Sequence, residues 1–201
     1  MRTVQHFVFD IGRVLLNYDP HLGYLDLIPD LEERTAFLET VCNHAWVTEQ
    51  DRGRSWEDSE AQLIAQFPNE EPLIRAFRQR WITMVPSAIE QNVSLMHDLI
   101  EAGKDVTLLT NFAADTFIEA QKKFTFLSAP RGATVSGHCG LLKPAKEIFA
   151  LHDKTFNLAP QKTIFVDDVM KNVDAARHHG WHAIHYSEDI DLPGAIAPFL
   201  L

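Results

Sequence analysis

The sequence predicts an α/β fold with a mostly parallel sheet covered by helices, and a small α-helical cap inserted after the first strand. Two observations carry this prediction. Short apolar runs that are typical of buried strands alternate with segments of helical spacing, which is the pattern of βαβ units. Residues 18–86 break this alternation, because they contain helical patterns and no convincing buried strand.

The expected elements follow the chain in order. The four apolar runs that predict strands are 3–11, 106–111, 163–168 and 182–187. One face of a predicted helix, which Gly103 ends, consists of Ile89, Val93, Met96, Leu99 and Ile100. A further helix is predicted over 169–179, with Gly180 directly after it. The strands are therefore expected to form a mostly parallel sheet with helices on both faces.

The inserted segment reads as a helical cap rather than a separate domain, because no Gly/Ser linker precedes or follows it. Helical patterns cover 31–43, 55–67 and 70–83. Trp46, Trp56 and Trp81 lie in this segment and are expected to form its core. The predicted organisation is a core of residues 1–17 and 87–201, with the cap at 18–86.

Composition excludes several classes of function. The chain of 201 residues is 46% hydrophobic and 23% charged, as in ordinary globular proteins, and its formal net charge is −10. An acidic protein lacks the basic face that nucleic acids and anionic membranes require, so neither partner is expected. The two cysteines form no CxxC pair, which favours a reducing, cytoplasmic location. We expect a monomer or a homodimer.

Polar and charged residues stand where the predicted strands end. Asp10 follows the first strand, Thr110 and Asn111 end the second, and Asp167 and Asp168 end the third. Ligands of parallel α/β sheets bind outside the carboxyl ends of the strands, so these residues are expected to share one site. Lys143, in the segment GLLKPAKEIF, lies in a loop just before a helix. The combination of strand-end acids and a loop lysine predicts a functional site.

The segments FVFDIGRVLL, LLTNF, GLLKP and FVDDVMKNVDAA resemble the four motifs of the haloacid dehalogenase-like (HAD) hydrolase superfamily, in the family's order. The resemblance covers nearly the whole chain and is closest to the branch of phosphatases with a helical cap. It implies a Rossmannoid core, a Mg²⁺ cofactor and hydrolysis of a small phosphorylated metabolite similar to a sugar phosphate. Each motif alone is weak evidence, but four in order are strong evidence.

The resemblance also implies a role for each motif residue. Asp10 would be the nucleophile that forms an aspartyl-phosphate, and Lys143 would contact both Asp10 and the phosphoryl group. The Thr110 hydroxyl and the Asn111 backbone N–H would bind phosphoryl oxygens. The expected magnesium site consists of Asp10, Asp168, the Gly12 carbonyl, and Asp167 or Asn172, all oxygen donors of the kind this ion prefers.

The cap of this family supplies groups that recognise the substrate. Three charged residues of the segment TEQDRGRSW could take this part or could simply be solvated, namely Glu49, Asp51 and Arg52. Of the three, Arg52 is the one expected to bind substrate.

One position departs from the phosphatase pattern. The usual motif is Asp-x-Asp, whose second Asp protonates the leaving oxygen and activates water, but this chain has Gly12. Such an acid–base group is typically worth about 10²–10⁴-fold in rate. Asp19, in the segment NYDP, is one candidate to replace it.

Two alternatives stay open. In a 2-haloacid dehalogenase the same Asp10 would attack carbon and need no metal, although the pair Asp167–Asp168 argues against this reading. A non-catalytic module that binds a phosphorylated ligand would keep the pocket and have lost turnover, and Gly12 is its best support.

Overall fold

A computed structural model describes residues 4–200, which form a five-stranded, all-parallel sheet in the order β3-β2-β1-β4-β5. The strands are β1 (His6–Phe9), β2 (Asp105–Thr110), β3 (Ala133–Val135), β4 (Thr163–Asp167) and β5 (His182–His185). Because β1 is central, the residue that follows it is flanked by the ends of β2 and β4.

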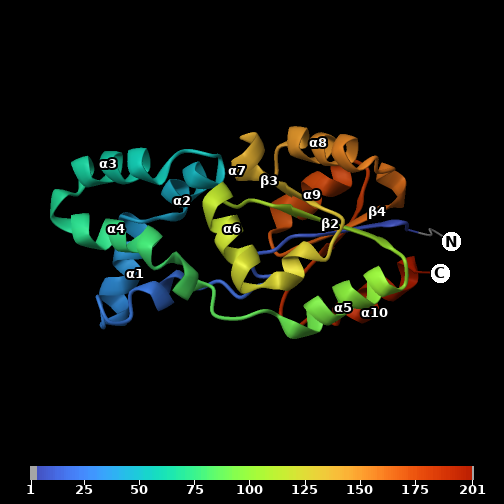
Figure 1. The fold of residues 1–201 in the computed structure, drawn as a ribbon, viewed down its shortest axis with the longest axis horizontal. Helices are drawn as coiled ribbons and strands as arrows, with labels where there is room; N and C mark the ends of the chain where they lie inside the picture. Colours follow the sequence, from blue (N-terminus) through green and yellow to red (C-terminus); the bar gives the residue numbers. More distant parts are fainter. Residues whose placement is uncertain (1–3, 201) are drawn as a thin grey trace.

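Helices cover both faces of the sheet (Figure 1). The helices of the core are α5 (Glu90–Glu101), α6 (Ala114–Lys123), α7 (Ser136–Cys139), α8 (Lys146–Phe156), α9 (Met170–His178) and α10 (Leu192–Ile196). Short 3₁₀ turns complete it at η4 (Thr125–Ser128), η5 (Pro160–Lys162) and η6 (Ala197–Phe199). The predicted α/β class and parallel sheet are confirmed.

The alternation of β1 divides its apolar side chains between two hydrophobic clusters, as the period of two in a strand requires. Phe7 and Phe9 pack with residues of α5, α6 and α10 on one face. Val8 packs on the other face with residues of α8 and α9. All three are at most 1% exposed. The strand that carries the site is therefore held from both sides.

Between β1 and α5 the chain forms only helices and short turns, which Figure 1 shows at one end of the molecule. They are η1 (Pro20–Gly23), α1 (Leu31–Thr40), α2 (His44–Asp51), α3 (Trp56–Gln66), η2 (Pro68–Glu70), α4 (Glu71–Gln79) and η3 (Trp81–Met84). We call residues 18–86, which contain these elements, the cap. Its boundaries at 17/18 and 86/87 stay a prediction.

Polar contacts join the cap to α6 of the core. The Arg78 guanidinium donates to Asp115 at 2.8 Å and to Glu119 at 2.6 Å. The Trp56 indole N–H donates to Asp115 at 3.1 Å. Lys123 Nζ donates to the Val85 carbonyl at 2.6 Å. These contacts hold one side of the cap against the core.

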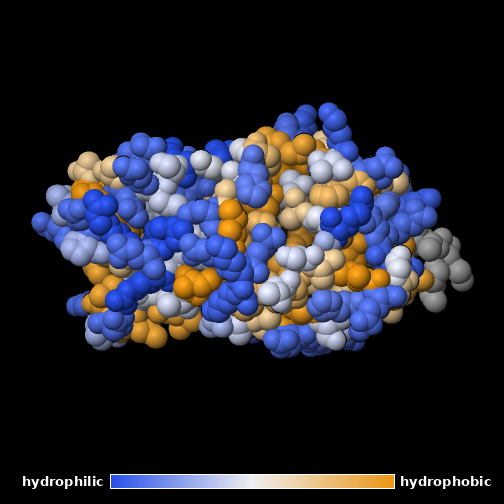
Figure 2. All heavy atoms as spheres, in the orientation of Figure 1, coloured by the Kyte–Doolittle hydropathy of each residue, from blue (hydrophilic) through white to orange (hydrophobic). Residues whose placement is uncertain are grey.

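Figure 2 shows hydrophilic residues over most of the viewed face, with smaller hydrophobic patches between them. In the described range 4–200, no helix is long and apolar enough to span a bilayer.

β3 and α2 were not predicted from the sequence, and neither were α7 and α10. β3 has only three residues, Ala133–Val135, too few to show an apolar period. The helix α2 has no apolar periodicity because its side chains face both the cap core and a pocket. Its start is marked locally, since the Asn43 side chain accepts a hydrogen bond from the Trp46 N–H at 3.0 Å.

The turn after β1 is held by α5. The Ile11 carbonyl accepts the N–H groups of Leu15 and Leu16, which closes the turn. The Asn92 side chain, 2% exposed, donates to the Val14 carbonyl at 2.6 Å. The Asn92 amide therefore satisfies a buried carbonyl next to the end of the central strand.

Replacing Asn92 with Leu should lower the free energy of unfolding by about 1–3 kcal/mol, because the Val14 carbonyl would lose its partner while staying buried. Urea titration of wild type and variant measures this difference. The matched control is Gln91→Leu at an exposed position of the same helix, which should change stability little. Equal effects of the two substitutions would contradict the role of Asn92.

Candidate active site

The strand ends bring the predicted residues together at one edge of the sheet. Phe9 pairs with Leu108 of β2 and with Val166 of β4. The next residue along β1, Asp10, therefore lies level with the ends of both neighbours, and its N–H donates to the Val166 carbonyl at 2.9 Å. The expected clustering of Asp10 with the end of β4 is observed.

Lys143 lies at the centre of this edge with a fully buried side chain. Its Nζ is 2.9 Å from Asp10 Oδ1 and 2.7 Å from Asp167 Oδ2. It also donates to the Leu109 carbonyl at 3.0 Å. A buried ammonium needs such partners, since burying an unpaired charge is very costly.

Asn111 holds the loop that carries Lys143. Its side-chain amide donates to the Lys143 carbonyl at 3.0 Å and accepts the Lys143 N–H at 2.8 Å. This two-way contact fixes the lysine backbone beside the end of β2. The motif resemblance predicts a role only for the backbone of Asn111, and this positioning by its side chain is an additional finding.

Three carboxylates, from Asp10, Asp167 and Asp168, have ligand oxygens within 4.8 Å of one another. Asp167 is fully occupied, because it also accepts hydrogen bonds from the Val169 N–H at 2.8 Å and from the Asn172 amide at 3.0 Å. Three acids against one ammonium leave excess negative charge. The donor set therefore fits a hard divalent cation such as Mg²⁺.

Burial and like charges shift the acid pKa values upward. Burial raises the pKa of Asp10 to about 7, with Lys143 opposing and Asp167 adding to the rise. Burial and Asp167 also raise the pKa of Asp168. Burial by itself would lower the pKa of Lys143, but Asp10 and Asp167 outweigh it and raise the pKa. A bound cation would return Asp10 to its ionised form.

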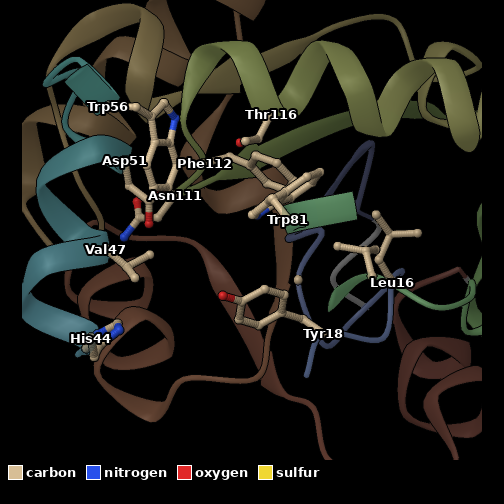
Figure 3. A pocket seen from close by; sticks show the side chains of 12 residues that line it. Leu16, Tyr18, His44, Val47, Asp51, Trp56, Trp81, Asn111, Phe112 and Thr116 are labelled. Carbon is tan, nitrogen blue, oxygen red and sulfur yellow. The ribbon is translucent and has the colours of Figure 1, made fainter. Parts of the chain in front are cut away.

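Two neighbouring pockets open at this edge of the sheet. The first, which we call the acid pocket, is lined by Asp10, Lys143, Asn172, Asn111 and Arg52, among others. The second, the apolar pocket, lies under the cap and is lined mostly by hydrophobic side chains (Figure 3). They include Leu16, Tyr18, Val47, Trp56, Trp81 and Phe112.

The structure places the remaining predicted residues as follows. Thr110 is 1% exposed, and no hydrogen bond found among residues 4–200 uses its hydroxyl. Gly12 lines the apolar pocket rather than the acid pocket. Arg52 reaches the acid pocket with a half-exposed side chain, 3.7 Å from Glu49. The roles of these residues stay predictions.

Asp19 is used elsewhere. Its carboxylate accepts the His21 N–H at 2.9 Å and so caps η1. It lines a separate pocket with Arg13 and Asp168, which contains neither Asp10 nor Lys143. The tryptophans also serve a second purpose, because Trp56 and Trp81 line the apolar pocket besides packing in the cap.

No family model matches the chain. The sesquiterpene phosphatase astK of Aspergillus oryzae is 28% identical over 191 residues, covering 94% of this chain and 92% of that protein. A HAD family enzyme of Bacteroides thetaiotaomicron, solved with magnesium and inorganic phosphate, matches with a TM-score of 0.73 at 17% identity, covering 96% and 98% of the two chains.

The fold is shared with dehalogenases as well. The L-2-haloacid dehalogenase of Xanthobacter autotrophicus, solved with covalently bound chloropropionic acid, matches with a TM-score of 0.65 at 14% identity, covering 96% of this chain and 82% of that one. The comparisons confirm the resemblance to HAD-like hydrolases that the four motifs predict, and they support a hydrolase. The fold alone does not choose between phosphorus and carbon chemistry.

Replacing Lys143 with Met should lower the free energy of unfolding by about 3–5 kcal/mol at pH 8 in metal-free buffer, because two buried carboxylates lose their shared cation. The loss should shrink at pH 5, because burial raises the pKa of Asp10, which is then protonated in the folded protein and no longer needs the cation. Urea titrations at both pH values measure it. Lys146→Met, at an exposed position, is the matched control, and a loss that is independent of pH would contradict the argument.

Proposed function

We propose that this chain is a magnesium-dependent phosphatase that hydrolyses phosphate monoesters of apolar alcohols, with Asp10 as the nucleophile. The observation that carries the proposal is the buried Lys143 between Asp10 and Asp167 at the end of the central strand. A carboxylate that approaches an anionic phosphoryl group is repelled by it. The buried ammonium beside Asp10 offsets this repulsion.

In this proposal the chain binds the phosphoryl group in the acid pocket. Asp10 attacks phosphorus and the ester bond breaks, which gives an aspartyl-phosphate that water then hydrolyses. Lys143 stabilises the negative charge that develops on the phosphoryl oxygens, because its position is fixed before the reaction. Thr110, whose hydroxyl makes no hydrogen bond to another of residues 4–200, donates to a phosphoryl oxygen.

The donors for the cation come from the turns that follow β1 and β4. Asp10, Asp168 and the Gly12 carbonyl would hold Mg²⁺, and the cation would offset the repulsion between nucleophile and substrate. Asp167 supports the site indirectly, because its oxygens already bind Lys143, Asn172 and the Val169 N–H. Asn172 in turn is held by that carboxylate.

The apolar pocket favours a hydrocarbon leaving group over a sugar. A sugar brings several hydroxyls that lose water on binding and need partners, and each unpaired one costs about 1–3 kcal/mol. The pocket offers mainly aromatic and aliphatic surface from residues such as Val47, Trp56 and Phe112. A hydrocarbon chain gains about 0.8 kcal/mol per buried methylene there. The relative that acts on sesquiterpene phosphates supports the same class.

The acid cluster favours phosphatase over dehalogenase. Attack on a carbon–halogen bond needs no cation, and three clustered carboxylates would then raise the cost of ionising Asp10 without benefit. The non-catalytic alternative rests on the missing carboxyl at Gly12, so turnover itself decides it.

Wild type should release phosphate from p-nitrophenyl phosphate and from a prenyl monophosphate when magnesium is present. It should release no phosphate after EDTA treatment. Asp10→Asn should abolish release from both, because an amide cannot form the covalent intermediate, while leaving the fold intact by circular dichroism. Halide release from 2-chloropropionate without phosphate release would instead favour the dehalogenase. Activity that survives EDTA would contradict the role of magnesium.

The substrate class is tested by a substitution in the apolar pocket. Val47→Asp should lower kcat/KM for farnesyl phosphate at least about 10-fold. A buried valine side chain contributes about 1.5–3 kcal/mol, and an aspartate charge in the apolar pocket would disfavour binding of the farnesyl group. Steady-state kinetics measure the ratio to p-nitrophenyl phosphate. Ile118→Asp, with a side chain 49% exposed on α6, is the control. A preference of wild type for glucose 6-phosphate would contradict the apolar class.

A further inference from the structure

The proposed reaction lacks an obvious proton donor. An alkoxide is a poor leaving group, so the ester oxygen of an alkyl phosphate needs a proton as its bond to phosphorus breaks. The residue two places after the nucleophile is Gly12, and a Cβ built there would meet no atom within 4 Å. The apolar pocket therefore has open space where a side chain at position 12 would stand.

Asp51, the last residue of α2, lies at the boundary between the two pockets. It lines the acid pocket together with Asp10 and Lys143. It also lines the apolar pocket together with Gly12 and Trp56, as Figure 3 shows for the labelled side chains. With the phosphoryl group at Asp10 and the hydrocarbon in the apolar pocket, the ester oxygen that joins them lies at this boundary.

We propose that the carboxyl group of Asp51, supplied by the cap, is the general acid and base that position 12 lacks. This inference rests on the proposed phosphatase activity and adds to it a catalytic residue on a different element from the usual one.

The backbone around Asp51 is fixed. The chain reverses at Gly53, whose φ of +101° favours glycine. A Cβ built at Gly53 would lie 3.2 Å from the Gly137 carbonyl oxygen, so this turn packs closely on the start of α7. The core therefore holds the backbone that carries Asp51.

The surroundings raise the pKa of the Asp51 carboxyl to near neutral pH. Burial raises the pKa of Asp51 to about 7, and Asp10 adds to the rise, while Ala113 and Lys143 oppose it. No hydrogen bond or ion pair among residues 4–200 joins Asp51 to Asp10 or Lys143. The ionisable groups that face it from its own helix and from the packed elements are Asp10, Tyr18, His44, Arg52, Lys143 and Lys171.

The proton balance closes over two steps. As Asp10 attacks phosphorus, the phosphorus–oxygen ester bond breaks, its electron pair goes to the leaving oxygen, and Asp51 donates its proton there to give the alcohol. The Asp51 carboxylate then takes a proton from water as the water oxygen attacks phosphorus. The bond to Asp10 breaks, phosphate leaves, and Asp51 is protonated again.

Two other groups fit less well. Asp19 uses its carboxylate to cap η1 and lines a pocket without the nucleophile. His44 lines both pockets, but it is the exposed first residue of α2, where bulk water competes for its protons. His44→Gln is therefore included in the test as a competing assignment.

The experiment compares Asp51→Asn with the control Glu39→Gln, an exposed carboxyl-to-amide change on α1 of the cap. We expect Asp51→Asn to lower kcat for farnesyl phosphate by about 10²–10⁴-fold. With p-nitrophenyl phosphate, whose leaving group needs little protonation, the variant should show a rapid burst of nitrophenol. An acid-trapped phosphoenzyme should then accumulate, because water lacks its base. Glu39→Gln should behave as wild type.

The pH profile adds a second readout. Wild-type kcat for farnesyl phosphate should fall as pH rises through about 7, because the acid must be protonated, and Asp51→Asn should lose this limb. Unchanged kcat in Asp51→Asn, an equal loss of burst and alkyl turnover, or the expected pattern in His44→Gln would each overturn the assignment. Absence of phosphate release by wild type from either ester would overturn the proposed function first.

Discussion

The candidate site depends on one interaction, the burial of the Lys143 ammonium between the carboxylates of Asp10 and Asp167. Each of these charges would be costly to bury alone, and each is tolerable because of the others. The arrangement needs three segments to meet within hydrogen-bond distance, which the order β2-β1-β4 provides at the centre of the sheet. Asn111 then fixes the lysine loop from β2. The order of the strands therefore determines whether these three charges can pair.

The cap adds a second environment beside the charged one. Trp56 contributes to the cap core, lines the apolar pocket and donates to Asp115 of the core. Arg78 binds the same carboxylate. The surface that would receive a hydrocarbon group is thus built partly from side chains that attach the cap to the core. A substrate with one anionic and one apolar end has a single orientation in such a pair of pockets, because each end is poorly solvated in the other pocket.

The sequence predicts most of this site because its charged residues follow directly after strands. Asp10 and Asp167 stand at the ends of apolar runs, and parallel pairing brings such ends together whatever the loops do. Other features depend on contacts that no local pattern encodes. The side-chain contact of Asn111 joins residues 32 positions apart, and the helix α2 faces a pocket, so its apolar period is lost. Asp51 could be marked only as a charged cap residue, since its place between the two pockets depends on how α2 packs against α7 of the core.

The location of the proposed proton donor has a consequence for how the site discriminates between substrates. A carboxyl group at position 12 would sit on the core turn beside Asp10 whatever the cap does. Asp51 belongs to α2, the same helix that contributes Val47 to the apolar pocket. Proton donation and hydrocarbon binding therefore depend on one helix, and the position of α2 affects both. A hydrocarbon group that packs against α2 also keeps bulk water away from the Asp51 carboxyl. A small phosphate ester neither packs against α2 nor excludes water from Asp51. Because position 12 is a glycine and the proposed acid lies on α2, the rate of the chemical step depends on binding of the apolar group.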